Sequence, residues 1–295
     1  MHMSSDQHHG CVFGTPWEGA HGTRIDSNRH YPRHWHTTYG FGLLERGAHR
    51  SASGRGEVDA HAGDVITSNP GEVHDGRPIA GTRRLWQMLY VERSAFARLA
   101  GDADGESSGA SFDIELTRPV IDDRLLRRAL RALFASLEHW SAANRSAGGE
   151  ALACDEALTH VGTLLLRRHS TRTRVAGDSA QARCSASPAL QRVRERLADD
   201  LLDPPPLAAL AELAGTSRYQ LLRRFQKAYG MPPHAWLIQQ RAQRACALVR
   251  AGVTLGEAAI EAGFADQSHM TRVFARQFGF TPGAWQRAVR PAPAQ

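Results

Sequence analysis

The chain has 295 residues, which is enough for two domains with cores of their own, and its mean hydropathy is −0.41. No apolar run approaches the length of a membrane span, and the polar amino-terminal residues lack the apolar stretch of a secretory signal. The four cysteines are far apart and form no CxxC pair, which argues against a zinc knuckle or a redox motif. We therefore expect a cytoplasmic protein in a reducing compartment that does not associate with membranes.

The positive charge is concentrated toward the carboxyl end of the chain. The formal net charge is +6; residues 188–295 contain 14 Lys+Arg against 8 Asp+Glu, whereas residues 1–187 contain 22 Arg against 22 Asp+Glu. This distribution is typical of a phosphate-binding domain joined to an electrically neutral partner domain.

Short β-like segments follow one another between residues 31 and 91. The strand candidates are 39–44, 57–60, 63–67 and 84–91, and Gly, Pro and Asn mark turns between them. Several short strands with turn signals at a spacing of about 8–12 residues favour a small barrel or a jelly roll. Residues 11–30, by contrast, indicate no clear element.

The hydrophobic period becomes helical after a Gly/Ser/Asp-rich stretch at 101–111. One predicted helix starts near Asp122, and a second follows the small polar segment 141–149, so the two form an antiparallel pair. Their apolar stripes are Leu126, Leu130, Leu133, Phe134, Leu137 and Trp140 in the first helix, and Leu152, Leu158, Val161 and Leu165 in the second. This pair either covers the barrel or forms a dimer interface.

Two carboxyl-terminal stretches, 211–236 and 258–285, share one plan: a helix, a turn at a glycine, a second helix, a glycine stop and a proline restart. Ala211 and Gly215 match Ala259 and Gly263 at an offset of 48, and Phe225, Gly230, Pro233 and Trp236 match Phe274, Gly279, Pro282 and Trp285 at an offset of 49. A repeated helix-turn-helix in the basic part of the chain indicates DNA binding, and its second helices are the candidate readers of the DNA.

The predicted reading helices present polar outer faces. Ser217 and Gln220 fit a capping box at the start of the first reading helix, and Asp266 or Ser268 caps the second. With Leu221, Phe225, Met270, Val273, Phe274 and Phe278 assigned to the core, the outward positions are Arg218, Tyr219, Leu222, Arg223 and Gln226, and Gln267, Ser268, His269, Thr271, Arg272 and Arg276. Arg, Gln, Ser and Thr suit base edges in the major groove, and the flanking cations suit phosphates.

These residues resemble the two-unit signature of the AraC/XylS family of bacterial transcription regulators over about residues 190–290. The matching positions are Ala211-x3-Gly215, Leu221-x-Arg223-x-Phe225, Gly230 and Arg241, then Ala259-x3-Gly263-Phe264-x3-Ser268-x3-Arg272-x-Phe274, Gly279 and Thr281-Pro282. The resemblance implies two helix-turn-helix subdomains joined by one long helix, with reading helices in successive major-groove segments about 34 Å apart.

The resemblance also implies which outward residues read bases. Tyr219, Leu222 and Arg223 correspond to base-reading positions in the first unit, as do Gln267, Ser268, Thr271 and Arg272 in the second; Arg218 completes the predicted DNA-binding set. Leu222 departs from the polar pattern, because an apolar residue there contacts a thymine methyl but forms no hydrogen bond. We therefore expect hydrogen-bonded readout mainly from the second unit.

The amino-terminal half resembles the two short motifs of cupin barrels, which many AraC-type regulators carry as sensing domains. The motifs here are His34-Trp35-His36 and Gly63-x6-Pro70-Gly71-x2-His74. The resemblance implies a barrel that binds a small-molecule effector. The candidate effector-binding residues are His36, Tyr39, Glu72, His74, Trp86 and Tyr90, although Trp86 and Tyr90 also suit an ordinary core.

Three histidines of these motifs are candidate ligands for a metal ion. Imidazoles of His34, His36 and His74 on adjacent strands could bind Zn or Fe in a facial arrangement. The metal-binding cupin pattern, however, places a Glu four or five residues after the second His, where this chain has Gly40 and Phe41. We therefore predict no metal and no cofactor, and expect these histidines to form hydrogen bonds near the barrel mouth.

The predicted fold class is α+β: an amino-terminal cupin-like β-barrel with a helical pair, and an all-α carboxyl-terminal domain with tandem helix-turn-helix units. The predicted domains are 1–170 for effector sensing and dimerisation, 171–187 as a linker of low hydrophobicity, and 188–295 for DNA binding. The predicted function is effector-controlled, sequence-specific transcription regulation without enzymatic activity. The expected partners are double-stranded promoter DNA, a small-molecule effector and a second copy in a homodimer, with RNA polymerase as a further candidate.

Two other hypotheses remain at this point. One is a metal-dependent cupin enzyme fused to a DNA-binding module, which a stoichiometric metal and substrate turnover would favour. The other is a ligand-free regulator whose barrel serves only for dimerisation, which an unchanged DNA affinity across many metabolites would favour.

Overall fold

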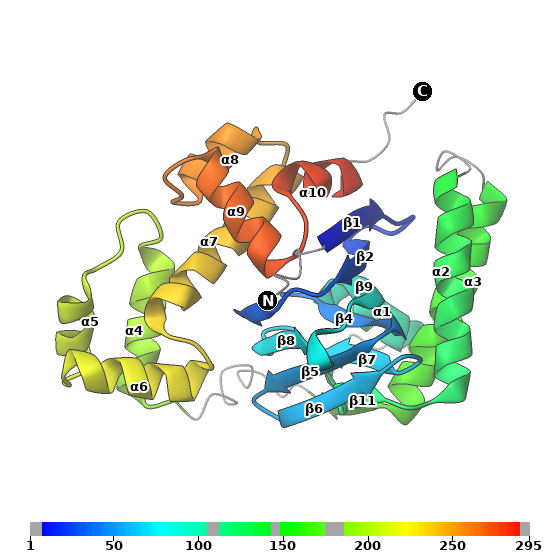
Figure 1. Cartoon of the computed structure of the whole chain (residues 1–295), viewed down its shortest axis with the longest axis horizontal. Coiled ribbons are helices and arrows are strands. Elements are labelled where there is room, and N and C mark those ends of the chain that lie inside the picture. The colour runs from blue at the N-terminus through cyan, green and yellow to red at the C-terminus, as the bar shows by residue number, and fades with distance from the viewer. Residues whose placement is uncertain (1–7, 105–111, 143–147, 175–185, 290–295) are drawn as a thin grey trace, which may run out of the picture.

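The computed structural model describes residues 8–104, 112–142, 148–174 and 186–289, which form a β-rich amino-terminal domain and a helical carboxyl-terminal domain (Figure 1). The strands are β1 (His8–Gly14), β2 (Ala20–Ser27), β3 (Tyr31–His34), β4 (Tyr39–Arg46), β5 (Ala48–Ser53), β6 (Gly56–His61), β7 (Val65–Ser68), β8 (His74–Pro78), β9 (Arg84–Val91), β10 (Phe112–Leu116), β11 (Val120–Ile121) and β12 (Ser170–Arg174). The helices are α1 (Arg93–Asp104), α2 (Arg124–Ala142), α3 (Gly148–Arg168), α4 (Pro188–Asp199), α5 (Leu207–Leu213), α6 (Arg218–Tyr229), α7 (Pro233–Arg250), α8 (Leu255–Glu261), α9 (Gln267–Gln277) and α10 (Pro282–Val289), with a short 3-10 turn at Ile79–Gly81.

Two antiparallel sheets form the amino-terminal domain, which confirms the predicted cupin-like fold. One has six strands in the order β1-β2-β9-β4-β7-β11, and the other has four in the order β3-β8-β5-β6. Because side chains alternate along a strand, β9 directs Trp86, Met88 and Tyr90 to one face and Leu89 and Val91 to the other. The first face lines the space between the sheets, and the second packs against helices.

The predicted helical pair covers the outer face of the six-stranded sheet. Leu126, Leu130 and Leu133 of α2 are fully buried in one cluster with Phe41 of β4 and Val161 of α3. The helices therefore serve as the second layer of the domain core, which was one of the two uses that the sequence allowed. The stripe predicted for α3 was wrong at Leu152, which is 59% exposed.

The first residues of the predicted linker, 171–187, belong to the amino-terminal domain. Residues 170–174 form β12, which pairs with β10 in a separate two-stranded sheet, so the first part of 171–187 belongs to the amino-terminal domain. Residues 175–185 lie outside the described residues. The carboxyl-terminal domain then begins with α4 at Pro188, as the sequence predicts.

The carboxyl-terminal domain has the predicted double helix-turn-helix arrangement. The α5–α6 unit and the α8–α9 unit are joined by the long helix α7, as the family resemblance implies. Gly230 ends α6 in the left-handed conformation (φ 76°), and Gly263 turns the chain between α8 and α9 (φ 88°). These are the positions at which the repeat places its glycines.

The two domains pack directly against each other, with the helical pair α2/α3 on the opposite side of the sheets from the helix-turn-helix units (Figure 1). Trp35 is buried among residues of α4, α5 and α6, and its carbonyl oxygen accepts a hydrogen bond of 2.9 Å from Gln239 of α7. Strand β1 lies against α10, where Val12 joins the core of the second helix-turn-helix unit. The domains therefore share apolar clusters.

Candidate nucleic-acid interface and effector pocket

The reading helices α6 and α9 are fixed by caps and by buried apolar residues. Ser217 accepts a hydrogen bond from the Gln220 backbone N–H, and Asp266 accepts one of 2.6 Å from the His269 backbone N–H. Phe225 of α6 and Phe274 of α9 are fully buried at matching positions of the repeat. Each helix therefore has one face anchored in its unit and the opposite face free for a partner.

The predicted DNA-binding residues gather on those free faces. Exposed side chains are those of Arg218, Tyr219, Arg223, Gln267, Ser268 and Arg272, whereas Leu222 and Thr271 are partly buried. The Arg223 guanidinium lies 5.9 Å from the centre of the Tyr219 ring, and the Thr271 hydroxyl donates a hydrogen bond of 2.8 Å to the Gln267 carbonyl within α9. The first face combines Arg with an aromatic ring and Leu, and the second is more uniformly polar.

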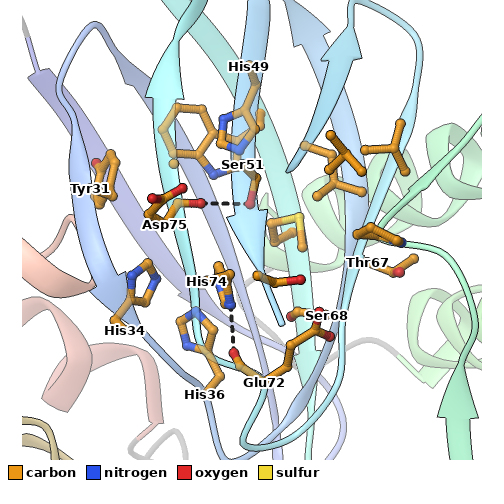
Figure 2. Close-up of a pocket in the computed structure, with 18 of the residues that line it drawn as sticks. Tyr31, His34, His36, His49, Ser51, Thr67, Ser68, Glu72, His74 and Asp75 are labelled. Atoms are coloured by element: carbon orange, nitrogen blue, oxygen red, sulfur yellow. Dashed lines mark hydrogen bonds between the residues drawn. The ribbon is translucent and has the colours of Figure 1, made fainter. Parts of the chain in front are cut away.

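A cavity of about 90 Å³ lies between the two sheets of the amino-terminal domain. Its lining includes the predicted effector residues His36, Glu72, His74, Trp86 and Tyr90, and also Tyr31, His34, His49, Ser51, Thr67, Ser68, Asp75 and Met88. Figure 2 shows the three histidines of the cupin-like motifs at one end of the cavity and apolar side chains toward the other. We call the end that holds these three histidines the polar end of the cavity, and apolar side chains such as Ile66 and Met88 line much of the remainder.

The placement of Tyr39 in this pocket was wrong. Tyr39 is buried on the opposite face of β4, where its ring stacks on Phe96 at 4.3 Å and its hydroxyl donates a hydrogen bond of 2.6 Å to the Ile114 carbonyl. The neighbouring Gly40 is the residue that faces inward, since a Cβ there would lie 2.5 Å from the Ser68 hydroxyl oxygen. The alternation of the strand thus assigns Tyr39 to the helix-covered core.

The carboxyl-terminal domain contributes to the lining of the same cavity. Gln277, the last residue of α9, and Phe278, which follows it, are both buried and lie at the cavity. The Phe278 ring is 6.1 Å from the His36 ring, centre to centre. Among the described residues, the side-chain oxygen of Gln277 has no hydrogen-bond partner. Sequence patterns assign Phe278 to the core and do not indicate that this core borders a pocket in the other domain.

The pocket histidines are neutral at physiological pH. Burial lowers the pKa of His34 to about 3, with a further contribution from the nearby His74. Burial, then His34 and His74, hold the pKa of His36 well below its usual range, and burial also lowers the pKa of His74. Neutral imidazoles offer one lone pair each, so this end of the pocket presents nitrogen acceptors.

Comparison with known proteins agrees with both halves of the fold. The family model of the AraC-like ligand binding domain matches residues 20–161, and that of a helix-turn-helix domain matches residues 210–288. The uncharacterized HTH-type transcriptional regulator YbfI of Bacillus subtilis (strain 168) is 28% identical over 240 residues, 81% of each chain, and the HTH-type transcriptional activator RhaR of Klebsiella pneumoniae is 32% identical over 163 residues, 55% of each chain. A crystal structure of ToxT from Vibrio cholerae has a TM-score of 0.44 and 10% identity over 98% of this chain and 99% of that one.

The fold and the paired sites define a transcription regulator with a ligand-binding domain and a helix-turn-helix DNA-binding domain. The chain belongs to the AraC family. No helix within the described ranges is both long and apolar enough to cross a membrane.

Proposed function

We propose that this regulator reads promoter DNA with α6 and α9, and that a small molecule in the pocket between the sheets controls this reading. The observation that carries the proposal is the position of α9. Its exposed face holds Gln267, Ser268 and Arg272, and its carboxyl end lies at the pocket. One helix therefore connects the ligand site to the nucleic-acid interface, so the domains need no signal through the linker.

The unpaired side-chain oxygen of Gln277 supports direct contact with an effector. A buried polar atom without a hydrogen bond costs about 1–3 kcal/mol, which a ligand N–H or O–H group would offset. This gain exists only while Gln277 remains at the pocket. The ligand therefore favours the docked arrangement of the domains over the undocked one, which is the differential affinity that regulation requires.

The size and polarity of the pocket restrict the effector class. The cavity of about 90 Å³ is smaller than the engineered cavity of about 150 Å³ that holds benzene in another protein. His36, His74 and Ser68 supply polar groups at one end (Figure 2), and Met88 and Trp86 add apolar surface to the lining. A small, polar effector with a short apolar part fits this lining.

The protein's setting is part of the proposal. Two copies would pair and bind two similar DNA sites, as isologous dimers do on repeated half-sites. The regulator would act in the cytoplasm, contact RNA polymerase at its promoters and catalyse no reaction. We assign effector binding and dimerisation to residues 1–170 together with the rest of β12, and DNA binding to residues 188–295.

A selection of genomic fragments with the purified full chain tests this function. We expect recovery of a small set of promoter fragments that share two similar sites. Their affinity should then change when metabolites that raise the protein's melting temperature are added. Recovery of fragments without a common sequence would contradict DNA reading, and an unchanged affinity for every stabilising metabolite would contradict control from the pocket.

A further inference from the structure

We infer that His34, His36 and His74 form a binding site for a divalent transition metal ion at the polar end of the pocket. His34 ends β3 and His36 lies two residues further on, whereas His74 begins β8 and meets them only in the fold. One ring nitrogen of each lies within 4.8 Å of the others. Imidazole is a preferred ligand of Zn²⁺, Fe²⁺, Ni²⁺ and Cu²⁺.

The spacing of the nitrogens requires only a small closure around an ion. A metal at about 2.0–2.1 Å from each nitrogen holds tetrahedral neighbours about 3.4 Å apart. The three rings already approach one another with centroid separations of 4.6–5.4 Å. Because the ring nitrogens already lie within 4.8 Å of one another, they need to approach by about 1.4 Å at most to reach this spacing.

Backbone carbonyl groups orient two of the rings for metal binding. The Nδ1 atom of His34 lies 2.7 Å from the Pro32 carbonyl oxygen, and Nδ1 of His74 lies 2.8 Å from the Glu72 carbonyl oxygen. A carbonyl oxygen only accepts, so each Nδ1 carries the proton and each Nε2 keeps its lone pair. A metal-ligating histidine almost always donates its other N–H to such a partner, which fixes the tautomer and the ring direction.

The missing cupin glutamate leaves coordination positions open rather than closing the site. Glu72, the nearest carboxylate in the sequence motif, is held by Arg55 in an ion pair of 2.6 Å. Three protein nitrogens with open positions are the arrangement in which Zn²⁺ also binds water or a small ligand. The open side faces the cavity, so a metal here would anchor an effector through a carboxylate or hydroxyl oxygen.

The position of the site gives the metal a route to the DNA-binding domain. The Phe278 ring, next to the end of α9, lies 6.1 Å from the His36 ring. Movement of His36 toward an ion changes the surface against which Phe278 packs. This regulatory consequence rests on the function proposed above, whereas metal binding itself does not.

Titration of EDTA-treated full chain with ZnCl₂, followed by calorimetry, tests the site. We expect one Zn²⁺ to bind per chain, with affinity at least 10-fold weaker in each of H34Q, H36Q and H74Q. H160Q, which changes an exposed histidine of α3, is the control and should bind as the unchanged chain does. His2, His8 and His9 are kept in every variant, so binding to the amino-terminal residues cannot produce the difference.

X-ray absorption of the zinc-loaded unchanged chain provides a second readout that does not depend on the folding of variants. We expect three imidazole ligands at about 2.0–2.1 Å. Equal zinc binding by the unchanged chain and H34Q/H36Q/H74Q, or no zinc binding at all, would overturn the site. If zinc does not bind but a metabolite alters DNA affinity, the metal site is wrong and the proposed function stands.

Discussion

The Phe278 ring of the DNA-binding domain lies 6.1 Å from the His36 ring of the sensing domain. Phe278 follows the last residue of a reading helix, and His36 lies in the first cupin-like motif. The contact means that the wall of the ligand pocket is also part of the core of the second helix-turn-helix unit. We therefore expect a change in pocket occupancy to act on the position of α9 without an intermediate element.

Gln277→Leu should uncouple the pocket from DNA binding while leaving the fold intact. The substitution removes a buried oxygen that has no partner among the described residues, so we expect the free energy of unfolding to stay within about 1 kcal/mol or to rise. The ligand-induced change in DNA affinity should fall by at least half. Titrations of operator DNA with and without a stabilising metabolite measure this, and an unaltered response would show that Gln277 has no part in coupling.

Gly10→Ala should weaken the packing between the two domains. A Cβ at Gly10 would lie 2.0 Å from the Gly279 carbonyl oxygen, and backbone atoms on both sides leave little room for adjustment. We expect a loss of about 1–3 kcal/mol and a separate melting transition for each domain. Gly54→Ala is the control, because no atom lies within 4 Å of its added Cβ. Identical melting curves for the two variants would contradict tight docking at β1.

The docking of the domains should also weaken in acid. Burial and the nearby Arg250 lower the pKa of His21 to about 3, and its ring stacks on Tyr90 at 5.1 Å and meets Trp285 edge-on at 4.5 Å. The undocked or unfolded ring takes up a proton near pH 6.5, so stability is complete above that pH and is lost as the pH falls toward 3.

The expected slope for His21 is at most about 1.4 kcal/mol per pH unit, because one proton is involved and the residue is only half-buried. Charge at this place also comes from the Arg250–Glu92 ion pair. His21→Phe keeps an aromatic ring and cannot take up a proton, so its stability should fall less steeply between pH 6.5 and 5. Equal slopes in thermal unfolding would show that His21 does not sense pH.

Arg272→Ala should weaken binding to the selected operator by about 1–3 kcal/mol if this exposed side chain of α9 contacts a base. Binding to shuffled DNA should change little. Arg276→Ala, on the same helix and also exposed, serves as the comparison and should reduce both affinities by similar factors if Arg276 contacts only phosphate. An equal loss on operator and shuffled DNA for Arg272→Ala would exclude base readout at this position.

The carboxyl-terminal domain followed from the sequence almost element by element, because its signals are local. Ser217 and Asp266 cap the helices that they were expected to cap, and the expected long helix α7 begins at Pro233, the proline restart of the first repeat. Capping residues, glycine turns and apolar residues spaced along one helix face act within a few residues of one another. They therefore remain readable without knowledge of the rest of the fold.

The amino-terminal half was less readable, because its strands pair across long stretches of sequence. Strands β1 and β2 lie in residues 8–27, where no element was predicted, and β2 is held by its pairing with β9. Helix α1 was missed for a similar reason: Phe96 is buried against Tyr39 and Phe41 of β4, a contact that no local pattern reveals. Tertiary packing decides these elements.

The residues of the pocket were predictable only in part, because some follow from local motifs and others from long-range packing. The motif histidines and Glu72 were identified from short patterns, whereas Tyr39 was assigned to the wrong face of its strand, since a single residue of register reverses its direction. Gln277 was not expected at the pocket because its place depends on the docking of two domains. The sequence offers one hint: Gln277 lies between Phe274 and Phe278, and both of these residues are assigned to the core.

The ratio of the full chain's affinities for its selected operator and for a shuffled sequence of equal length tests the central claim most directly. Measured at physiological salt, the operator should bind at least 10³-fold more tightly, as specific regulators do. The ratio should fall when Arg272 is replaced by Ala. Equal affinities for the two DNAs would contradict sequence-specific reading by α6 and α9, whatever the pocket binds.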